Sequence, residues 1–562
     1  MHDLVIRGAT VVDGSGAPGR PLDVAVANGR IAEVGAVAGT GRREIRADGL
    51  LLTPGFVDIH THYDGQATWD ASLTPSCWHG VTTAVFGNCG VGFAPLKPGK
   101  SDYLINLMQG VEDIPEAVLA EGIDFCWESF EGYLQALADK PHAIDIGTQM
   151  PHGALRFYVM GERGADHQEV PTAAELSEMT RLVEQSLAAG ALGVSTSRTP
   201  KHRAADGRPT PSMTADAPEL HALAEGLRRA GRGVLQVNSD FGPGEFELLR
   251  QATVHSGRPL SVLLLQSDKA PDLWRETLAN LSAGRAAGLA MNGQVGAKGI
   301  GILMCLDSSR HPFLDHPAWA PLAGLPGREV AARLQADPAL RARLVGERTG
   351  APAERFMQRM LERSFVMDEA QDYEPDMSAS LGARAAREGS TVWALAMDAL
   401  LAEQGGGLLM HPFENYSEGS LDVVREMLVS DATVMGLSDA GAHVGLICDG
   451  AAPTFLLKHW ARDRRRGERI ALEFLVHKQT RGNALAYGLP DRGLIAPGMK
   501  ADLNLIDFAQ LDLRRPTIVH DMPAGGRRFI QRARGYRHTF VSGVEILRDD
   551  ELTGELPGRL IR

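Results

Sequence analysis

The middle of the chain alternates short apolar segments with longer amphipathic ones, and this alternation constrains the fold more than any other feature. Helix-like stretches such as residues 172–190 and 217–231 separate several of the apolar segments. Eight segments are typical of buried strands: GFVDIHTH, VTTAVFGNCG, AIDIGTQMPHG, ALGVSTS, GVLQVNSDF, LSVLLLQSD, LAMNGQV and TVMGLSDAG. Continuous apolar strands joined by amphipathic helices indicate parallel βα units, and eight such units can close into a TIM-type barrel. We therefore predict an α/β fold with a (β/α)8 barrel.

The two ends of the chain have a different pattern. The segments LVIRGATVVDG and PLDVAVANGRIAEVG alternate β-branched and polar residues between Gly, Pro and Asn turns. Near the C-terminus, GLIAPGMKADLNLIDF and YRHTFVSGVEILRDD follow the same pattern. We expect residues 1–53 and 489–562 to form one small antiparallel β domain beside a barrel domain over residues 54–488.

Two stretches of the barrel region, near residues 97–140 and 300–400, are too long for ordinary loops. The second contains a charged helical run, REVAARLQADPALRARLVGERTGAPAERFMQRMLERS. Insertions of this length on a barrel often form lids or oligomer contacts. The alternative is a solvated helical decoration, so self-association into a homo-oligomer is an expectation that the sequence leaves open.

Composition excludes several classes of protein. Acidic residues outnumber basic ones, 70 against 57, which argues against a protein that neutralises nucleic-acid phosphates. The five cysteines are widely spaced and contain no CxxC, so they favour a reducing, cytoplasmic compartment over a disulfide framework. No apolar stretch approaches the roughly 18 residues that a membrane span needs, and the first residues lack a signal sequence. We expect neither nucleic acid nor a membrane as a partner.

The segment GFVDIHTH ends with His60 and His62. Alternate residues of a strand share a face, so both imidazoles are expected to point into the barrel mouth, where they could bind one metal ion. Asp439 follows the last predicted strand, which neighbours the first strand in a closed barrel. Its carboxylate could lie beside that metal and accept a proton from a water molecule, or it could simply cap a helix.

Five motifs together resemble a known family. In order they are MHDLVIRGATVVDGSG, LLTPGFVDIHTHYD, GVTTAVFGNCGVGFAP, GLSDAGAH and DRGLIAPGMKADLNLIDF. They are similar to the amidohydrolase superfamily, and within it to the N-acyl-D-amino-acid deacylase (D-aminoacylase) branch. The match is clearest over residues 1–96 and 430–545. The resemblance implies a TIM-like barrel with a small β-sandwich built from both termini, a metal at the barrel mouth and hydrolysis of an amide or related bond.

The resemblance also implies the metal ligands. They would be His60, His62, Cys89 in GNCG, and Asp439, and a thiolate at that point is a sensible zinc ligand. Cys89 read without the motif is a small buried apolar residue.

Relatives with a second, tight zinc carry histidines at the ends of strands five and six, but here those strands read VLQVNSDF and VLLLQSDK. Amide groups such as those of Gln236, Asn238 and Gln266 are poor zinc ligands. We therefore expect a single Zn²⁺ on His60, His62 and Asp439, with Cys89 near or on it. A two-metal site that uses Asp240 is the alternative.

Several further residues are candidates for substrate binding. Arg198 and Lys201 belong to the cationic loop STSRTPKHRAADGR after strand four, which would suit a substrate carboxylate if it is not merely a solvated loop. His443, four residues after Asp439, and His152, at the end of strand three, could face the site or be structural. His79 is expected to be structural.

The sequence thus predicts a metal-dependent hydrolase of a small-molecule amide, most directly an N-acyl amino acid, with the D configuration favoured by the resemblance. The metal would activate water, and Asp439 would serve as general base and then acid. One alternative keeps this machinery for a cyclic amide, carbamate or xenobiotic amide. Another is a non-catalytic scaffold.

Overall fold

Parallel strand pairing dominates the middle of the computed structural model, which describes residues 1–369 and 371–562. One sheet pairs β6 (Phe56–Asp58), β7 (Val81–Phe86) and β8 (Asp145–Thr148). A second runs from β9 through β10, β11, β12 and β13 to β17, with bounds Met150–Pro151, Gly193–Arg198, Val234–Ser239, Leu260–Leu263, Met291–Val295 and Thr433–Met435. All eight predicted strand segments are present, and the α/β class is confirmed.

The two parallel sheets meet at both of their ends. One residue separates β8 from β9, so these strands continue the same path along the chain. At the other end, a parallel bridge joins Thr61, beyond β6, to Ala440, beyond β17. The chain segments after the first and the last strand of the series therefore lie side by side.

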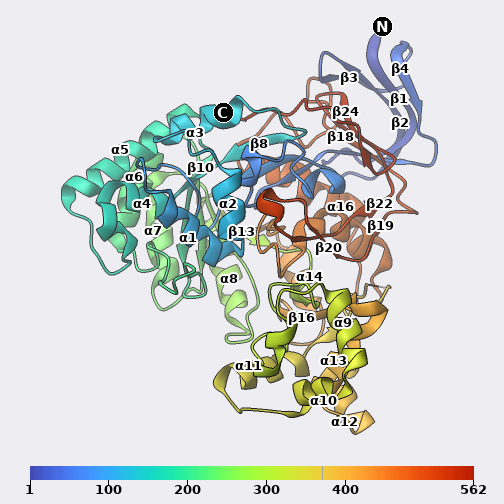
Figure 1. Cartoon of the computed structure of the whole chain (residues 1–562). Helices are drawn as coiled ribbons and strands as arrows, with labels where there is room; N and C mark the ends of the chain where they lie inside the picture. Colours follow the sequence, from blue (N-terminus) through green and yellow to red (C-terminus); the bar gives the residue numbers. More distant parts are fainter. Residues whose placement is uncertain (370) are drawn as a thin grey trace.

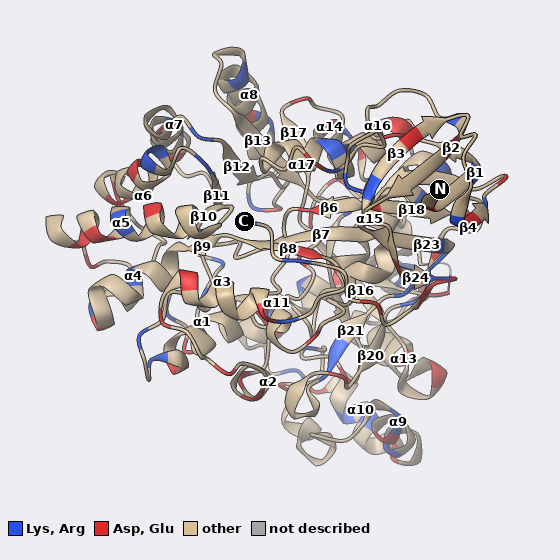
Figure 2. Cartoon of the chain, turned by 90° about the horizontal axis from the view of Figure 1, so that it is seen from above, with Lys and Arg blue, Asp and Glu red and all other residues tan. Residues whose placement is uncertain are grey.

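Helices connect these strands, as the periodicity predicts. They are α4 (His152–Met160), α5 (Ala173–Ala189), α6 (Ala217–Ala230), α7 (Glu245–Ser256), α8 (Leu273–Ala286) and α14 (Asp422–Leu428). The start of α6 is fixed by Asp216, whose side chain accepts a hydrogen bond from the backbone of Glu219, and its end by Gly231 in the left-handed conformation. In Figure 2 residues of both charges are intermixed along such outer helices, whereas the parallel strands such as β10 and β11 are largely tan.

Both chain termini build a single nine-stranded sheet. Its N-terminal strands are β1 (His2–Val11), β2 (Arg20–Ala27), β3 (Arg30–Gly35), β4 (Gly41–Arg46) and β5 (Leu51–Pro54). Its C-terminal strands are β18 (Leu503–Ile506), β23 (Tyr536–Val541), β24 (Val544–Arg548) and β25 (Glu551–Leu552). Antiparallel pairing of β5 with β18 joins the two halves, which lie together in Figure 1.

The expectation of purely antiparallel pairing in this terminal domain is wrong. β1, β2 and β3 are antiparallel neighbours, but β4 and β5 both pair with β1 in parallel. The β2–β3 hairpin occupies one edge of β1, so the chain must cross to the other edge, and a crossover connection delivers a parallel strand. The sheet is therefore mixed.

The two long stretches form ordered structure. Residues 97–140 contain α1 (Ser101–Glu112), α2 (Glu116–Gly122) and α3 (Phe130–Ala138). The second stretch contains β14 (Ile300–Met304), α9 (Gly327–Ala336), α10 (Pro338–Gly346), α11 (Pro352–Glu362), β15 (Phe365–Val366), α12 (Leu381–Glu388) and α13 (Val392–Gly405).

Helices α9 to α13 project as a lobe at the bottom of Figure 1. This lobe has its own cluster of buried apolar side chains, which includes Val330, Leu361, Trp393 and Leu400. It is tied back to the strands through β14, which pairs with β16 (Leu409–Glu414). The second stretch is therefore a folded lobe with a core of its own.

Short helices α15 (Ala452–Phe455), α16 (Leu472–His477) and α17 (Asn483–Ala486) follow the last parallel strand. No helix in the described part of the chain is both long and apolar enough to cross a membrane.

Candidate metal centre

His60 and His62 lie just beyond β6, both buried, with their ring centroids 5.4 Å apart. The Nδ1 atom of His60 is 2.6 Å from the side-chain oxygen of Gln294. The amide nitrogen of Gln294 donates to Ser261 and to Tyr487, so its oxygen is left to accept from His60. The proton of His60 is therefore on Nδ1, and Nε2 carries a free lone pair.

Cys89 and Asp439 surround that lone pair. The His60 Nε2 atom is 3.5 Å from the Cys89 sulfur and 3.3 Å from Asp439 Oδ1. His62 Nε2 is 3.7 Å from the same carboxylate oxygen. One ligand atom each of His60, His62 and Cys89 lies within 4.8 Å of the others. The structure thus brings together all four residues for which the resemblance implied a metal.

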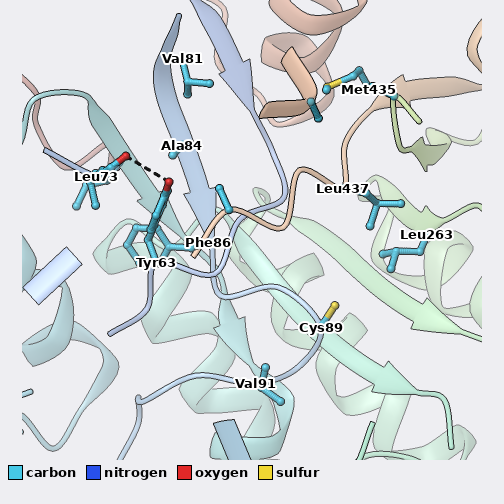
Figure 3. Close-up of a cluster of buried hydrophobic side chains, with 14 of the residues drawn as sticks. Tyr63, Leu73, Val81, Ala84, Phe86, Cys89, Val91, Leu263, Met435 and Leu437 are labelled. Carbon is cyan, nitrogen blue, oxygen red and sulfur yellow. Dashed lines mark hydrogen bonds between the residues drawn. The ribbon is translucent and has the colours of Figure 1, made fainter. Parts of the chain in front are cut away.

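Backbone geometry at this site is strained. Cys89, Leu437, Asp439 and His443 have φ values of 54°, 56°, 46° and 50°, in the left-handed region that side chains other than glycine seldom adopt. Figure 3 shows Cys89 on the loop that follows β7, with Leu437 and Leu263 from neighbouring segments. Such strain is concentrated at functional sites, where the surrounding fold holds it in place.

Burial and charge set the protonation of these groups. Burial lowers the pKa of His60 to about 4, against the opposing charge of Asp439, so His60 is neutral. Burial alone would raise the pKa of Asp439, but a hydrogen bond from His62 and the nearby imidazoles lower it. Burial raises the pKa of the Cys89 thiol to about 11 despite His62. A thiol of this kind becomes a thiolate when a cation binds it.

The pKa of His62, in contrast to that of His60, is raised. Burial by itself would lower its pKa, but the charge of Glu112, together with hydrogen bonds to Asp439 and Cys89, raises it well above the usual value. Without a cation at the site, His62 is therefore the group that carries positive charge. A metal ion would take over that role.

These residues open onto a cavity of about 200 Å³. Its polar lining is His62, Cys89, Glu112, Lys201, His202, Asn238, Glu414, Asp439 and His443. Its apolar lining is Val111, Leu263, Leu265, Ile300, Phe413, Leu437 and Ile447. The ends of the parallel strands, the first long stretch and β16 all contribute to this lining.

Two of the four predicted substrate-binding residues reach the cavity. Lys201 lines it, with its ammonium 2.9 Å from Glu414 and 3.3 Å from Asp240. His443 lines it as well, with Nε2 3.5 Å from a carboxylate oxygen of Glu112. Both side chains are therefore near enough to a bound substrate to contact it.

The structure does not bring Arg198 or His152 to the cavity. The guanidinium of Arg198 forms a bidentate ion pair with the Glu245 carboxylate, and the longer of the two contacts is 3.1 Å. The ring nitrogens of His152 are each 2.9 Å from a partner, Thr196 on one side and Glu219 on the other. Neighbouring carboxylate and hydroxyl groups bind the Arg198 guanidinium and the His152 imidazole. Spacing along the sequence does not reveal these partners.

His79 is buried between Thr454 and the Gln531 carbonyl, in agreement with a structural role.

Three residues at the site escaped the sequence prediction. Gln294 interrupts an apolar strand, which is a usable signal for a buried polar role. His202 belongs to the cationic loop and places Nε2 3.2 Å from the Asn238 amide. Glu112 ends α1 in a stretch that was expected to be a lid, an oligomer contact or a decoration, and no local pattern distinguishes it from other acids.

The model of the amidohydrolase family matches residues 43–546. The chain belongs to the amidohydrolase family. As a member it is a hydrolase, and the resemblance seen in the motifs is confirmed.

Known relatives agree with this assignment. N-acyl-D-aspartate deacylase of Alcaligenes xylosoxydans xylosoxydans is 28% identical over 573 residues, which cover 100% of this chain and 95% of that protein. D-aminoacylase of the same organism is 35% identical over 195 residues, but this match covers only 34% of the chain and 37% of the relative.

Among solved structures, N-acyl-D-glutamate deacylase of Bordetella bronchiseptica has a TM-score of 0.66 at 23% identity, covering 100% of this chain and 99% of its own. That structure contains zinc and a phosphonate mimic of the tetrahedral intermediate. The likeness establishes a common fold.

Proposed function

We propose that this protein is a metal-dependent hydrolase that cleaves the amide bond of N-acyl amino acids, with D-configured substrates. The observation that carries the proposal is the convergence of His60, His62, Cys89 and Asp439 at one end of the cavity. The relatives named as deacylases of N-acyl-D-amino acids support the substrate class.

The donor set fits a zinc ion. Two imidazoles, a thiol and a carboxylate are the ligand types that zinc takes in proteins. His60 already presents an unprotonated nitrogen, because Gln294 holds its other nitrogen. Asp439 is ionised and lies within 3.7 Å of both imidazoles, so the ligands need little rearrangement.

The residues on the side of the cavity opposite the proposed ligands favour a single metal ion. Asn238 lies there with its amide nitrogen 3.7 Å from the Cys89 sulfur. The Gln266 oxygen accepts a hydrogen bond from the Ser417 backbone. Asp240 pairs with Lys201 and does not line this cavity. A second tight zinc would find amide groups and the single imidazole of His202 on this side, a weaker donor set than that of the proposed site.

The chemistry follows from these positions. A divalent cation held by these residues would acidify a water molecule and polarise an amide carbonyl. Asp439, ionised and beside the ligands, would orient that water, accept its proton and return the proton to the leaving amine. His443 and Lys201 line the same cavity and would hold the substrate in place.

The lining of the cavity suits a small amide with one carboxylate and apolar substituents. Among the described residues that line it, Lys201 is the only lysine or arginine, and it would pair with the carboxylate of the amino acid. Seven apolar side chains remain for the acyl group and the amino-acid side chain. A volume of about 200 Å³ restricts the site to small molecules.

We further propose that the eight parallel strand segments close as a (β/α)8 barrel over residues 54–488. The bridge between Thr61 and Ala440 supports closure, since it joins the ends of the strand series. The segments 1–53 and 489–562 would form the accompanying β-sandwich, built around the sheet that both termini share. This arrangement would put the proposed metal at the carboxyl ends of the strands, where barrel enzymes carry their active sites.

The test is amide hydrolysis by the purified protein, with metal content measured on the same sample. N-acetyl-D-amino acids with apolar side chains should be cleaved, their L-enantiomers and N-acetyl-D-aspartate more slowly. Removal of metal by a chelator should abolish cleavage, and zinc should restore it. Cleavage of a cyclic amide or carbamate in place of these substrates would replace the substrate class. Absence of both metal and hydrolysis would favour a scaffold.

A further inference from the structure

Helix α1 delivers a buried carboxylate to the metal ligands. Glu112, the last residue of α1, is only 1% exposed. Its Oε1 atom is 3.3 Å from His62 Nδ1, and its Oε2 atom is 3.5 Å from His443 Nε2. The Glu112 carboxylate therefore contacts two imidazoles: that of His62, which follows the first parallel strand β6, and that of His443, which follows the last one, β17.

The end of α1 is fixed in place by its surroundings. The carboxylate of Asp113 accepts hydrogen bonds from the Ser309 hydroxyl at 2.9 Å and the Gly445 backbone at 3.2 Å. The backbone N–H of His443 also donates to the carbonyl of Glu112. Both long stretches of the chain thus meet the loop after β17 here, and Glu112 is a fixed part of the site and not the tip of a mobile lid.

The charge on Glu112 requires a positive partner. A buried carboxylate is costly unless it is paired. In the described part of the chain its ion pairs involve only His62 and His443. The His62 Nδ1 atom and the Glu112 Oε1 atom are both buried without a hydrogen-bond partner among the described residues, and they lie 3.3 Å apart, so a small ring rotation would let each satisfy the other. A metal on the far nitrogen of His62 would keep positive charge next to this carboxylate while Nδ1 retains its proton.

The two histidine ligands therefore differ in what holds them. Nδ1 of His60 faces the neutral amide of Gln294, whereas Nδ1 of His62 faces the carboxylate of Glu112. A carboxylate in this position fixes the tautomer of a ligating histidine, orients the ring and increases its basicity as a ligand.

We propose that Glu112 is a positioning residue for the metal centre: it holds His62 with Nδ1 protonated and Nε2 directed at the metal, and it ties His443 to the same cavity. This inference rests on the proposed metal site. It assigns the first long stretch a specific task, which is to supply a charged partner that the strand ends themselves lack.

The experiment measures metal affinity on the full-length protein. Zn²⁺ and Co²⁺ binding to wild type and to Glu112→Gln is determined by competition with a chromogenic chelator, and the visible absorption of the Co²⁺ forms is recorded. We expect Glu112→Gln to bind either metal about 10- to 100-fold more weakly, with an altered Co²⁺ spectrum. Glu112→Asp, which keeps the charge, should lie closer to wild type.

The matched control is Asp102→Asn, which removes an exposed carboxylate in the first turn of the same helix without touching His62. It should leave metal affinity and the Co²⁺ spectrum unchanged. Wild-type affinity and spectrum in Glu112→Gln, or equal losses in both variants, would overturn the role of Glu112. Failure of wild type itself to bind either metal would instead refute the proposed site.

A crystal structure of the zinc-loaded wild type tests the same inference without any variant. The expected result is zinc on His62 Nε2, with Glu112 within about 3.2 Å of Nδ1. Ligation through Nδ1, or zinc bound directly by the Glu112 carboxylate, would overturn it.

Discussion

Both sides of the cavity are formed by the ends of parallel strands, but the two sides present different kinds of side chain. The loops after β6, β7 and β17 supply two imidazoles, a thiol and a carboxylate. Across the cavity, β11, the end of β12 and the segment after it supply Asn238, Leu263 and Leu265, and the loop after β10 supplies Lys201 and His202. The comparison shows that equivalent strand ends need not be equivalent in function. The proposed metal ligands are concentrated on one side, and the other side is left for the substrate.

The strongest test of the charged side is Asp439→Asn. The amide cannot accept a proton from water, so hydrolysis should fall by about 10³-fold or more while the fold persists. Steady-state kinetics and circular dichroism would measure both. Asp240→Asn, on the opposite side, is the control and should keep near-normal activity. Activity within tenfold of wild type in Asp439→Asn would exclude Asp439 as the base.

The number of metal ions per chain directly tests the difference in metal ligands between the two sides of the cavity. Elemental analysis of protein purified without chelator should give about one divalent ion per chain, because the paired imidazoles, the thiol and Asp439 lie on one side, while the other side offers only His202 beside the amide of Asn238. A value near two would mean that oxygen donors such as Asp240 hold a second ion, and the contrast between the two sides would be lost.

Asn238→His should reduce the asymmetry. Its amide nitrogen lies 3.7 Å from the Cys89 sulfur, so an imidazole at this position would be within reach of that ligand. We expect a second equivalent of zinc to bind, seen as a change from about one to about two ions per chain. Ser239→His, the next residue along the strand, points to the other face and should remain at one. A single equivalent in both variants would contradict the expected gain.

Lys201→Met tests the substrate side. Loss of the ammonium should raise KM for N-acyl amino acids about tenfold, or about 1.4 kcal/mol, with a smaller change in kcat. For substrates that lack the carboxylate, KM should be the same in wild type and in Lys201→Met. Glu414→Gln is the companion variant, since it removes the closest competing carboxylate and should lower KM. An unchanged KM in Lys201→Met would remove Lys201 from substrate binding.

Arg198→Ala should have the smallest effect on activity. The guanidinium is 8% exposed and paired with Glu245, so its loss should lower the free energy of unfolding by about 2 kcal/mol. KM should stay within twofold of wild type. Denaturant unfolding and steady-state kinetics separate the two quantities. A tenfold rise in KM would restore Arg198 to the substrate site that its place in the sequence suggested.

Most of the scaffold could be predicted because its determinants are local. The eight apolar segments, the helices between them and the two histidines at the end of GFVDIHTH are visible in short windows of the chain, whereas Cys89 was proposed as a ligand only from the family resemblance. Parallel pairing of β4 and β5 with β1 was missed, because strand direction depends on which edge of β1 remains open.

Long-range pairing decided the remaining site residues. Arg198 and His152 stand near strand ends in the sequence, but their partners Glu245 and Glu219 come from α7 and α6, each beyond the next βα connection. Glu112 could not be predicted, since its place depends on where the last turn of α1 meets the loop after β17.

The sequence by itself determined the alternation of strands and helices and the chemistry available at each strand end, because hydrophobic periodicity and residue type act over a few neighbouring positions. Only the tertiary structure decided which charged side chains face the cavity and which are paired elsewhere. A carboxylate or guanidinium binds the nearest complementary group in space, and that group is supplied by whichever distant segment the fold places beside it.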